Sequence, residues 1–316
     1  MKRTARTLTA LFALGWALLL AAADMDYGLA PEQIAPDTWV LTGRSEDFSP
    51  RNGGNIVNTA FVVTSAGVLV IDSGPSRAYG EQLRRAIARV TDKPVVLVVD
   101  THHHPDHFLG NQAFPRETLA ALPGTRHGID TEGSALNENM YRLVGDWMAG
   151  TEPVAPTRAL AAGPLQLGEH RFELLALDGH TDADLAILDR STGVLFAGDL
   201  VFHDRAPTTP HARLDAWQAA LARLEALPFT RLVPGHGPVA SDAAPIRQTR
   251  AWLRWLDDTL RQAAEAGLDM TEVLAQPLPP EHRRLAVSEA EYRRSAGQLY
   301  PAYEQRALEG SGKATR

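Results

Sequence analysis

The stretch Thr101-His102-His103-His104-Pro105-Asp106-His107 places five candidate metal ligands within six consecutive residues, directly after the apolar run 95–99. Neutral imidazoles and carboxylates are ligands that Zn²⁺ binds at about 2.0 to 2.2 Å. His102 and His104 are two residues apart, so in an extended chain they project to the same side. Pro105 favours that extended geometry for His104. Asp106 and His107 follow on a turn and would face the same cavity from another angle, so this segment predicts the start of two adjacent metal sites.

The amino terminus has the pattern of a secretory signal peptide. Lys2, Arg3 and Arg6 precede an apolar run at 8–20, and small residues follow at 21–23. The alternative is a membrane anchor, but the apolar run is shorter than the roughly 20 residues that a spanning helix needs. We therefore expect a signal peptide at 1–23, its removal, and a periplasmic or secreted protein.

Composition excludes several classes of chemistry. The chain has 316 residues, 44% of them hydrophobic, which is enough for a large core in one domain or two, and it contains no cysteine. Thiolate ligands, cysteine nucleophiles and disulfides are thus excluded. The formal net charge of −7 becomes −10 once the three cationic residues of the leader are removed, since the leader has no acidic residue. That charge argues against nucleic acid as a partner.

The order of predicted elements indicates an α/β protein. In the first half we expect strands at 38–41, 60–63, 68–71 and 95–99, and a helix at 78–90. Helix and loop are expected between 115 and 156. In the second half we expect strands at 172–177, 185–188, 194–197 and 231–233, and a helix at 214–227. Beyond about residue 245 the charged, alanine-rich sequence predicts a helical tail of packing residues without obvious chemistry.

Three strands of the second half end in a possible ligand beside glycine: Gly179-His180, Gly198-Asp199 and Gly235-His236-Gly237. Glycine permits the backbone angles and close approach that a tight metal loop needs. Each signal alone is weak, because a lone Gly-His-Gly or Gly-Asp is more often a turn. Together with the histidine cluster that precedes them in the sequence, however, these three motifs indicate a metal site.

The ordered set His-x-His-x-Asp-His, Gly-His, Gly-Asp and Gly-His-Gly resembles the metallo-β-lactamase fold superfamily of metal-dependent hydrolases. The likeness spans roughly residues 33–244. It implies a four-layer αββα sandwich with a catalytic domain at 31–245 and a C-terminal helical extension at 246–316.

Carried over by position, the resemblance implies two Zn²⁺ ions, although iron or manganese would suit the same ligands. His103 is not a ligand in the family and is expected to fill space or to support the ligands from outside. Asp72 matches a position that braces the histidine loop, with a plain turn residue as the alternative. The implied ligands are His102, His104 and His180 for one ion, Asp106, His107 and His236 for the other, and Asp199 as a bridge.

Two such ions some 3.5 to 4 Å apart share a water and lower its pKa toward neutrality, so a metal-bridging hydroxide is the implied nucleophile. It would attack a carbonyl or similar electrophile. Asp106 is the implied catalytic residue, orienting the hydroxide or taking its proton. No serine or cysteine nucleophile is required.

Other polar residues are candidates for contacts around the ions and the substrate. The turn 52–55, including Asn55, is a candidate flap over the metals. His203, Arg205 and His211 follow the Asp199 loop and could reach a substrate anion, with a solvated loop as the plainer alternative. Asp182 and Asp184 would add negative charge near the cations and are candidates to steady His180 or His236.

Asp199 also narrows the choice of branch. True β-lactamases of this superfamily lack the bridging aspartate, so its presence favours hydrolysis of a small-molecule ester, thioester or lactone. The exported amino terminus, the turn at 52–55, the lead at 91–94 and the helical tail are similar to the quinoprotein relay system zinc metallohydrolases. That likeness implies a link to a periplasmic quinoprotein dehydrogenase.

Two alternatives stay open at this point. The fold could serve as a non-hydrolytic accessory module that binds a quinone or a partner protein and keeps its metal for structure. It could also be a mono-iron enzyme like the persulfide dioxygenases, which retain similar histidines.

Overall fold

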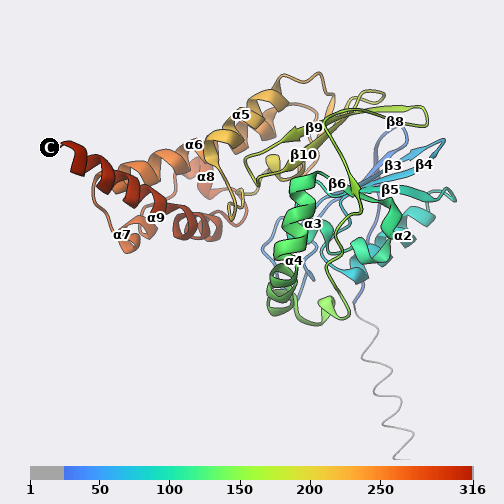
Figure 1. Ribbon diagram of the computed structural model, residues 1–316, viewed down its shortest axis with the longest axis horizontal. Helices are drawn as coiled ribbons and strands as arrows, with labels where there is room; N and C mark the ends of the chain where they lie inside the picture. The colour runs from blue at the N-terminus through green and yellow to red at the C-terminus, as the bar shows by residue number, and fades with distance from the viewer. Residues whose placement is uncertain (1–24, 315–316) are drawn as a thin grey trace, which may run out of the picture.

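A computed structural model describes residues 25–314, so the predicted signal peptide at 1–23 lies outside the described residues. None of the described helices is both long and apolar enough to cross a membrane. Two sheets form the centre, with helices on either side (Figure 1). This arrangement confirms the predicted α/β sandwich with a helical C-terminal part.

The first sheet has seven strands in the order β1-β2-β3-β4-β5-β6-β7. The pairs from β1 to β4 are antiparallel, and those from β4 to β7 are parallel. The strands are β1 Glu32–Ala35, β2 Thr38–Leu41, β3 Thr59–Thr64, β4 Gly67–Ile71, β5 Val95–Val99, β6 Leu119–Ala121 and β7 Arg158–Ala159.

The second sheet has the order β12-β11-β10-β9-β8, and only its β11-β12 pair is parallel. Its strands are β8 Gly163–Leu167, β9 His170–Leu177, β10 Asp184–Asp189, β11 Val194–Phe196 and β12 Arg231–Val233. The helices are α2 Arg77–Ala88, α3 Pro105–Phe108, α4 Pro123–Val144, α5 Leu214–Glu225, α6 Ala244–Glu265, α7 Met270–Leu274, α8 Pro280–Arg283 and α9 Ser288–Ala314.

Side chains that alternate between the two faces of each strand explain why the fold has four layers, with two sheets packed between two layers of helices. On β4, Leu69 packs in the cluster between the two sheets, whereas Val68 and Val70 pack in the cluster that includes Leu83 and Ile87 of α2. Successive side chains of a strand point to opposite faces. Strands that are apolar at every position must therefore be covered on both sides, which places α2 on one face of the sheet and the second sheet on the other.

The C-terminal helices share a core with the second sheet. Trp217 of α5, Trp252 of α6, and Tyr292 and Tyr300 of α9 are buried in one cluster with Leu195 of β11. Figure 1 shows α6 to α9 extending away from the sandwich toward the C-terminus. The predicted domain boundary at 245/246 falls in the first turn of α6.

An ion-pair network fixes α9 to the loop after Asp199. Arg205 and Glu291 are both buried, with Arg205 Nη2 3.2 Å from Glu291 Oε1. Thr208 Oγ1 donates to the same oxygen at 2.8 Å, and Arg294 Nη1 lies 2.7 Å from Glu291 Oε2. One carboxylate of the helical tail therefore holds a loop of the sandwich.

We expect Glu291→Gln to lower the free energy of unfolding by about 3 to 5 kcal/mol, because it leaves the buried Arg205 guanidinium without its counter-charge. Urea unfolding measures the loss. The matched control is Glu265→Gln, which breaks an exposed pair with Arg261 and should cost less than about 1 kcal/mol. Equal effects of the two substitutions would contradict this account of the network.

Candidate metal centre

Asp72 fixes the histidine loop to the end of the neighbouring strand. Its Oδ1 accepts a hydrogen bond from the Thr101 backbone N–H at 2.7 Å, and its Oδ2 accepts one from Thr101 Oγ1 at 2.9 Å. His107 Nδ1 lies 2.8 Å from the same Oδ2. Since β4 and β5 are parallel, their carboxyl ends meet and bring these residues together. Asp72 thus directs the other ring nitrogen of His107, Nε2, toward the centre.

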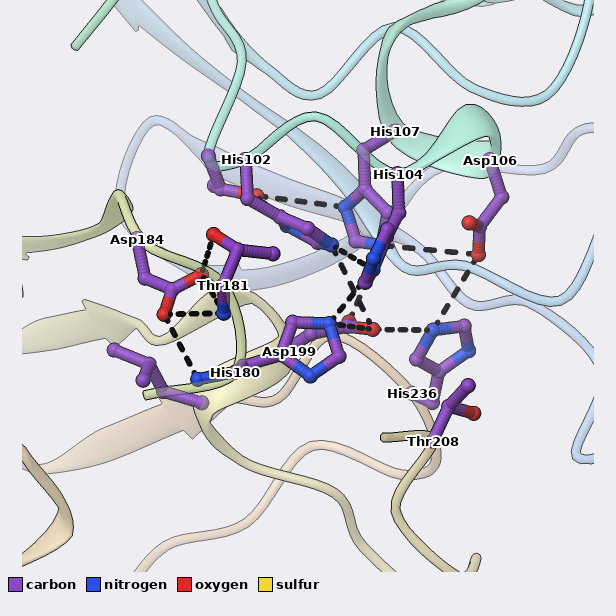
Figure 2. Close-up of polar contacts among 12 residues, drawn as sticks. His102, His104, Asp106, His107, His180, Thr181, Asp184, Asp199, Thr208 and His236 are labelled. Atoms are coloured by element: carbon purple, nitrogen blue, oxygen red, sulfur yellow. Dashed lines mark hydrogen bonds and ion pairs between the residues drawn. The ribbon is translucent and has the colours of Figure 1, made fainter. Parts of the chain in front are cut away.

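The first ligand group comprises His102, His104, His180 and Asp199, all buried (Figure 2). His104 Nδ1 lies 3.0 Å from His102 Nε2 and 2.8 Å from His180 Nε2. Asp199 Oδ2 lies 3.4 Å from His180 Nε2 and 3.9 Å from His102 Nε2. Four donor atoms thus converge within 4.8 Å of one another, the spacing of ligands around one ion.

The second group comprises Asp106, His107 and His236. Asp106 Oδ2 lies 3.4 Å from His236 Nε2 and 3.7 Å from His107 Nε2. Asp199 approaches this group as well, with Oδ1 3.2 Å from His107 Nε2 and Oδ2 3.2 Å from His236 Nε2. The carboxylate of Asp199 therefore lies between the two groups (Figure 2).

The donor set fits two divalent ions. Ligand atoms about 2.0 to 2.2 Å from a tetrahedral zinc lie roughly 3.4 Å apart, close to the separations in both groups. His107 Nε2 and Asp199 Oδ1 are buried without a hydrogen-bond partner, although they face each other. Buried polar atoms seldom stay unpaired, so these orphaned lone pairs are suited to metal bonds.

Burial keeps the imidazoles of the first group neutral and thus able to coordinate. It lowers the pKa of His102 and of His104 well below the ordinary value, and that of His180 to about 3. At His107 burial also opposes the charged form, but the carboxylates of Asp199 and Asp72 outweigh it and raise the pKa. A metal ion would replace that proton.

The remaining ligands are supported by the backbone around them. His236 Nδ1 lies 2.8 Å from the carbonyl oxygen of Ile56, which orients Nε2 inward. Asp184 accepts hydrogen bonds from the backbone N–H groups of His180 and Thr181, and burial raises its pKa to about 7. Asp184 therefore steadies the loop that carries His180 without touching its ring.

Glycine is required beside the bridging aspartate. A Cβ added at Gly235 would lie 1.9 Å from Asp199 Oδ1, and one at Gly179 would lie 2.3 Å from the backbone of Trp217. Gly198 has a positive φ of 51°. These close approaches account for the glycines that the sequence places beside the ligands.

A pocket of about 360 Å³ opens onto the second group and is lined by His104, Asp106, Asp199 and His236 among others. A larger hollow of about 1010 Å³ between α6 and α9 contains none of the predicted ligands. The apolar side chains of the ligand-lined pocket are Phe48, Ile56, Pro105, Leu136, Leu143 and Pro210.

Some predicted contacts are not formed. Neither Asn55 nor His203 lines the pocket, and His203 Nδ1 instead lies 2.7 Å from the carbonyl oxygen of Pro238. The turn at 52–55 contributes through its neighbours, since Asp47, Phe48 and Ile56 line the pocket. The predicted role of Asp182 is also wrong, because its exposed carboxylate pairs with Arg213 and not with a ligand.

Arg205 and His103 lie beside the two ligand groups and belong to neither of them. Arg205 lines the pocket but is buried against Glu291, so it holds the fold together. His103 points to the outside of the first group, where its ring packs against Gly128 of α4. Gly128 leaves the space that this ring occupies, since an added Cβ would lie 2.6 Å from His103 Cγ.

Residues of two helices complete the pocket and were not predicted. Leu136 and Leu143 come from α4, and Arg294 and Gln298 come from α9. The C-terminal tail, predicted to be helical and to consist of packing residues, therefore also contributes two residues to the pocket wall. Arg294 is one of three arginines of α9, and no local signal distinguishes it from Arg293 or Arg306, because only the packing of α9 places it at the pocket.

The fold and the centre define a class: an αββα sandwich with two adjacent His/Asp groups, able to hold metal, at its strand ends. The family described as the metallo-beta-lactamase superfamily matches residues 52–236, and the chain belongs to that superfamily.

Curated relatives with named activities are hydrolases. The chain is 30% identical over 204 residues to the acyl-coenzyme A thioesterase MBLAC2 of Gallus gallus, covering 58% of this chain and 73% of that protein. It is 22% identical over 260 residues to a linear primary-alkylsulfatase of Pseudomonas sp., covering 68% of this chain and 49% of that protein. A hydroxyacylglutathione hydrolase of Rhodobacter capsulatus is 29% identical over 150 residues, covering 46% of this chain and 49% of that protein. The chain thus spans about half the length of the last two.

Solved structures show the same fold. A metallo-beta-lactamase from Pontibacter korlensis has a TM-score of 0.58 and 22% identity, and the alignment covers 72% of this chain and 99% of that one. At 22% identity this structural similarity shows that the fold is shared and does not show that the activity is shared.

We expect Asp72→Ala to weaken the ion held by Asp106, His107 and His236 by about 10- to 100-fold, because His107 loses the acceptor that orients its ring. Competition with a chromophoric zinc chelator measures the affinity of each ion. Asp182→Ala, which removes an exposed carboxylate, is the control and should leave both affinities unchanged. An Asp72→Ala protein with wild-type affinities would show that the brace is dispensable.

Proposed function

We propose that the protein is a dinuclear zinc hydrolase that acts on an ester, thioester or lactone. One observation carries this proposal: two buried ligand groups share the carboxylate of Asp199 beside a pocket that is open to substrate. Two ions held there would supply Lewis acidity and lower the pKa of water. The chain contains no cysteine, so a thiolate nucleophile is excluded.

We propose a second role for Asp106, as the proton acceptor. Its carboxylate lines the pocket, and its Oδ2 faces His236 and His107. A carboxylate in that position can both hold an ion and take a proton from the attacking water. His104 and His236 also line the pocket, so both ligand groups border the space where a carbonyl would lie.

The pocket favours a substrate with an apolar part. Phe48, Leu136 and Leu143 offer an apolar wall, on which an acyl chain gains about 0.8 kcal/mol for each buried methylene. Two of the relatives named above are thioester hydrolases, acting on acyl-coenzyme A and on hydroxyacylglutathione by their names. Their chemistry supports an acyl substrate for this chain.

The location and the partner are part of the same proposal. The basic and apolar residues of 1–23 support export to the periplasm, and the likeness to the quinoprotein relay system zinc metallohydrolases supports a link to a quinoprotein dehydrogenase. Iron or manganese in place of zinc is the competing metal assignment, since imidazole and carboxylate accept all three metals. A mono-iron enzyme like the persulfide dioxygenases is the competing activity.

The test is hydrolysis by protein of known metal content. We expect about two zinc ions per chain and turnover of at least one substrate class in a panel of acyl esters, thioesters, lactones and phosphodiesters. Chelation should abolish that turnover and added zinc should restore it. Asp106→Asn should lower kcat by about 10²- to 10⁴-fold through loss of the proton acceptor.

Protein that holds two zinc ions but hydrolyses none of the panel would overturn the proposal. In that case His104→Ala separates the alternatives. A variant that loses metal yet keeps its function in cells would favour the accessory module that binds a quinone or a partner. Iron in protein purified from its native compartment would favour the mono-iron enzyme like the persulfide dioxygenases.

A further inference from the structure

The ring of His104 has a second partner on the side away from the ligand groups. Its Nδ1 faces His102 and His180, and its Nε2 lies 2.9 Å from Nδ1 of His211. The two rings are nearly parallel, with 27° between their planes and 5.2 Å between their centroids. His211 belongs to the loop between β11 and α5, and its side chain is one-third exposed.

The contact continues to a carboxylate. His211 Nε2 lies 3.2 Å from Oε2 of Glu132, which comes from α4. Glu132 is partly exposed, so the row His104, His211, Glu132 runs from the first ligand group toward solvent.

Only one placement of protons satisfies every atom in this row. An ion bound at His104 Nδ1 leaves the proton on Nε2, which must donate to His211 Nδ1. His211 then carries its own proton on Nε2 and donates it to the Glu132 carboxylate. Every ring nitrogen in the row therefore has one defined role, and the row fixes both the tautomer and the orientation of His104.

The C-terminal helix holds His211 in place. Thr209 Oγ1 lies 2.7 Å from Ser295 Oγ, and Thr208 Oγ1 donates to Glu291, both partners being residues of α9. The Ala212 backbone N–H donates to the Thr209 carbonyl. The loop that carries His211 is thus anchored two and three residues before it.

His104 differs in this respect from the ligands whose outer nitrogen has a fixed partner. His107 has the buried carboxylate of Asp72, and His236 has the main-chain carbonyl of Ile56. The partner of His104 is a second imidazole at the pocket wall. A change at this position alters the support of one ligand group and leaves that of the other intact.

We propose that His211, backed by Glu132, is a positioning residue for the metal site formed by His102, His104 and His180. The proposal rests on the metal binding of the proposed function. Ligand histidines whose outer N–H loses its acceptor typically lose 10- to 100-fold in metal affinity. His211 touches a ligand and no reacting atom, so its effect is on the ion and its ligand and not on chemistry directly.

The test measures the affinity of each of the two zinc ions by chelator competition, without reference to activity. His211→Ala should weaken one ion by about 10- to 100-fold and leave the other within about 2-fold of wild type. His211→Gln should recover part of the loss, because its amide oxygen can accept the proton of His104. Glu132→Gln should give a smaller loss with the same selectivity.

His127→Ala is the matched control, since His127 is an exposed histidine of the same helix as Glu132. A comparison with Asp72→Ala shows which ion His211→Ala weakens. Asp72→Ala should weaken the ion held by Asp106, His107 and His236, so a protein with both substitutions should bind both ions more weakly. Cobalt-substituted protein gives a second readout, as His211→Ala should change its visible spectrum.

Unchanged affinities in His211→Ala would overturn the proposal, as would equal weakening of both ions without recovery in His211→Gln. A wild-type protein that binds no metal would instead overturn the proposed function itself. The two failures are therefore distinguishable in one set of titrations.

Discussion

The carboxylate of Asp199 is the group on which the rest of the centre depends. It is buried, it lies within 3.9 Å of nitrogens from four histidines, and those histidines come from three separate loops. His236 and His107 hold its pKa well below the ordinary value against the opposing effect of burial. A negative charge kept at that point allows two cations to lie side by side, and the sandwich positions its loops so that this charge is shared.

Much of the centre could be predicted because it lies at strand ends. The apolar runs predicted β5, β9, β11 and β12, and the loops that follow these strands carry the ligands that the structure brings together. Parallel strands end at a common edge of a sheet, so residues that directly follow such strands in the sequence can be expected to lie close together in space. The spacing of His102 and His104 has the same origin, since an extended backbone puts both on one side.

The surroundings of the ions could not be predicted in the same way. Neither Asn55 nor His203 lines the pocket, and the ring of His203 instead contacts the carbonyl oxygen of Pro238. Leu136 and Arg294 line the pocket from α4 and α9, whose positions depend on contacts between distant segments, such as Gly128 with His103 and Arg294 with Asp47. The local sequence pattern predicts that a segment is a helix or a strand. The side of a helix that faces a pocket depends on how all the elements of the core pack together.

The most direct test of the central claim is anomalous diffraction at the zinc edge from crystals of the zinc-loaded protein. The account predicts two peaks about 3.5 to 4 Å apart. One should lie within bonding distance of His102, His104 and His180, the other within bonding distance of Asp106, His107 and His236, and the Asp199 carboxylate between them. A single peak, or two peaks of which neither contacts Asp199, would contradict it.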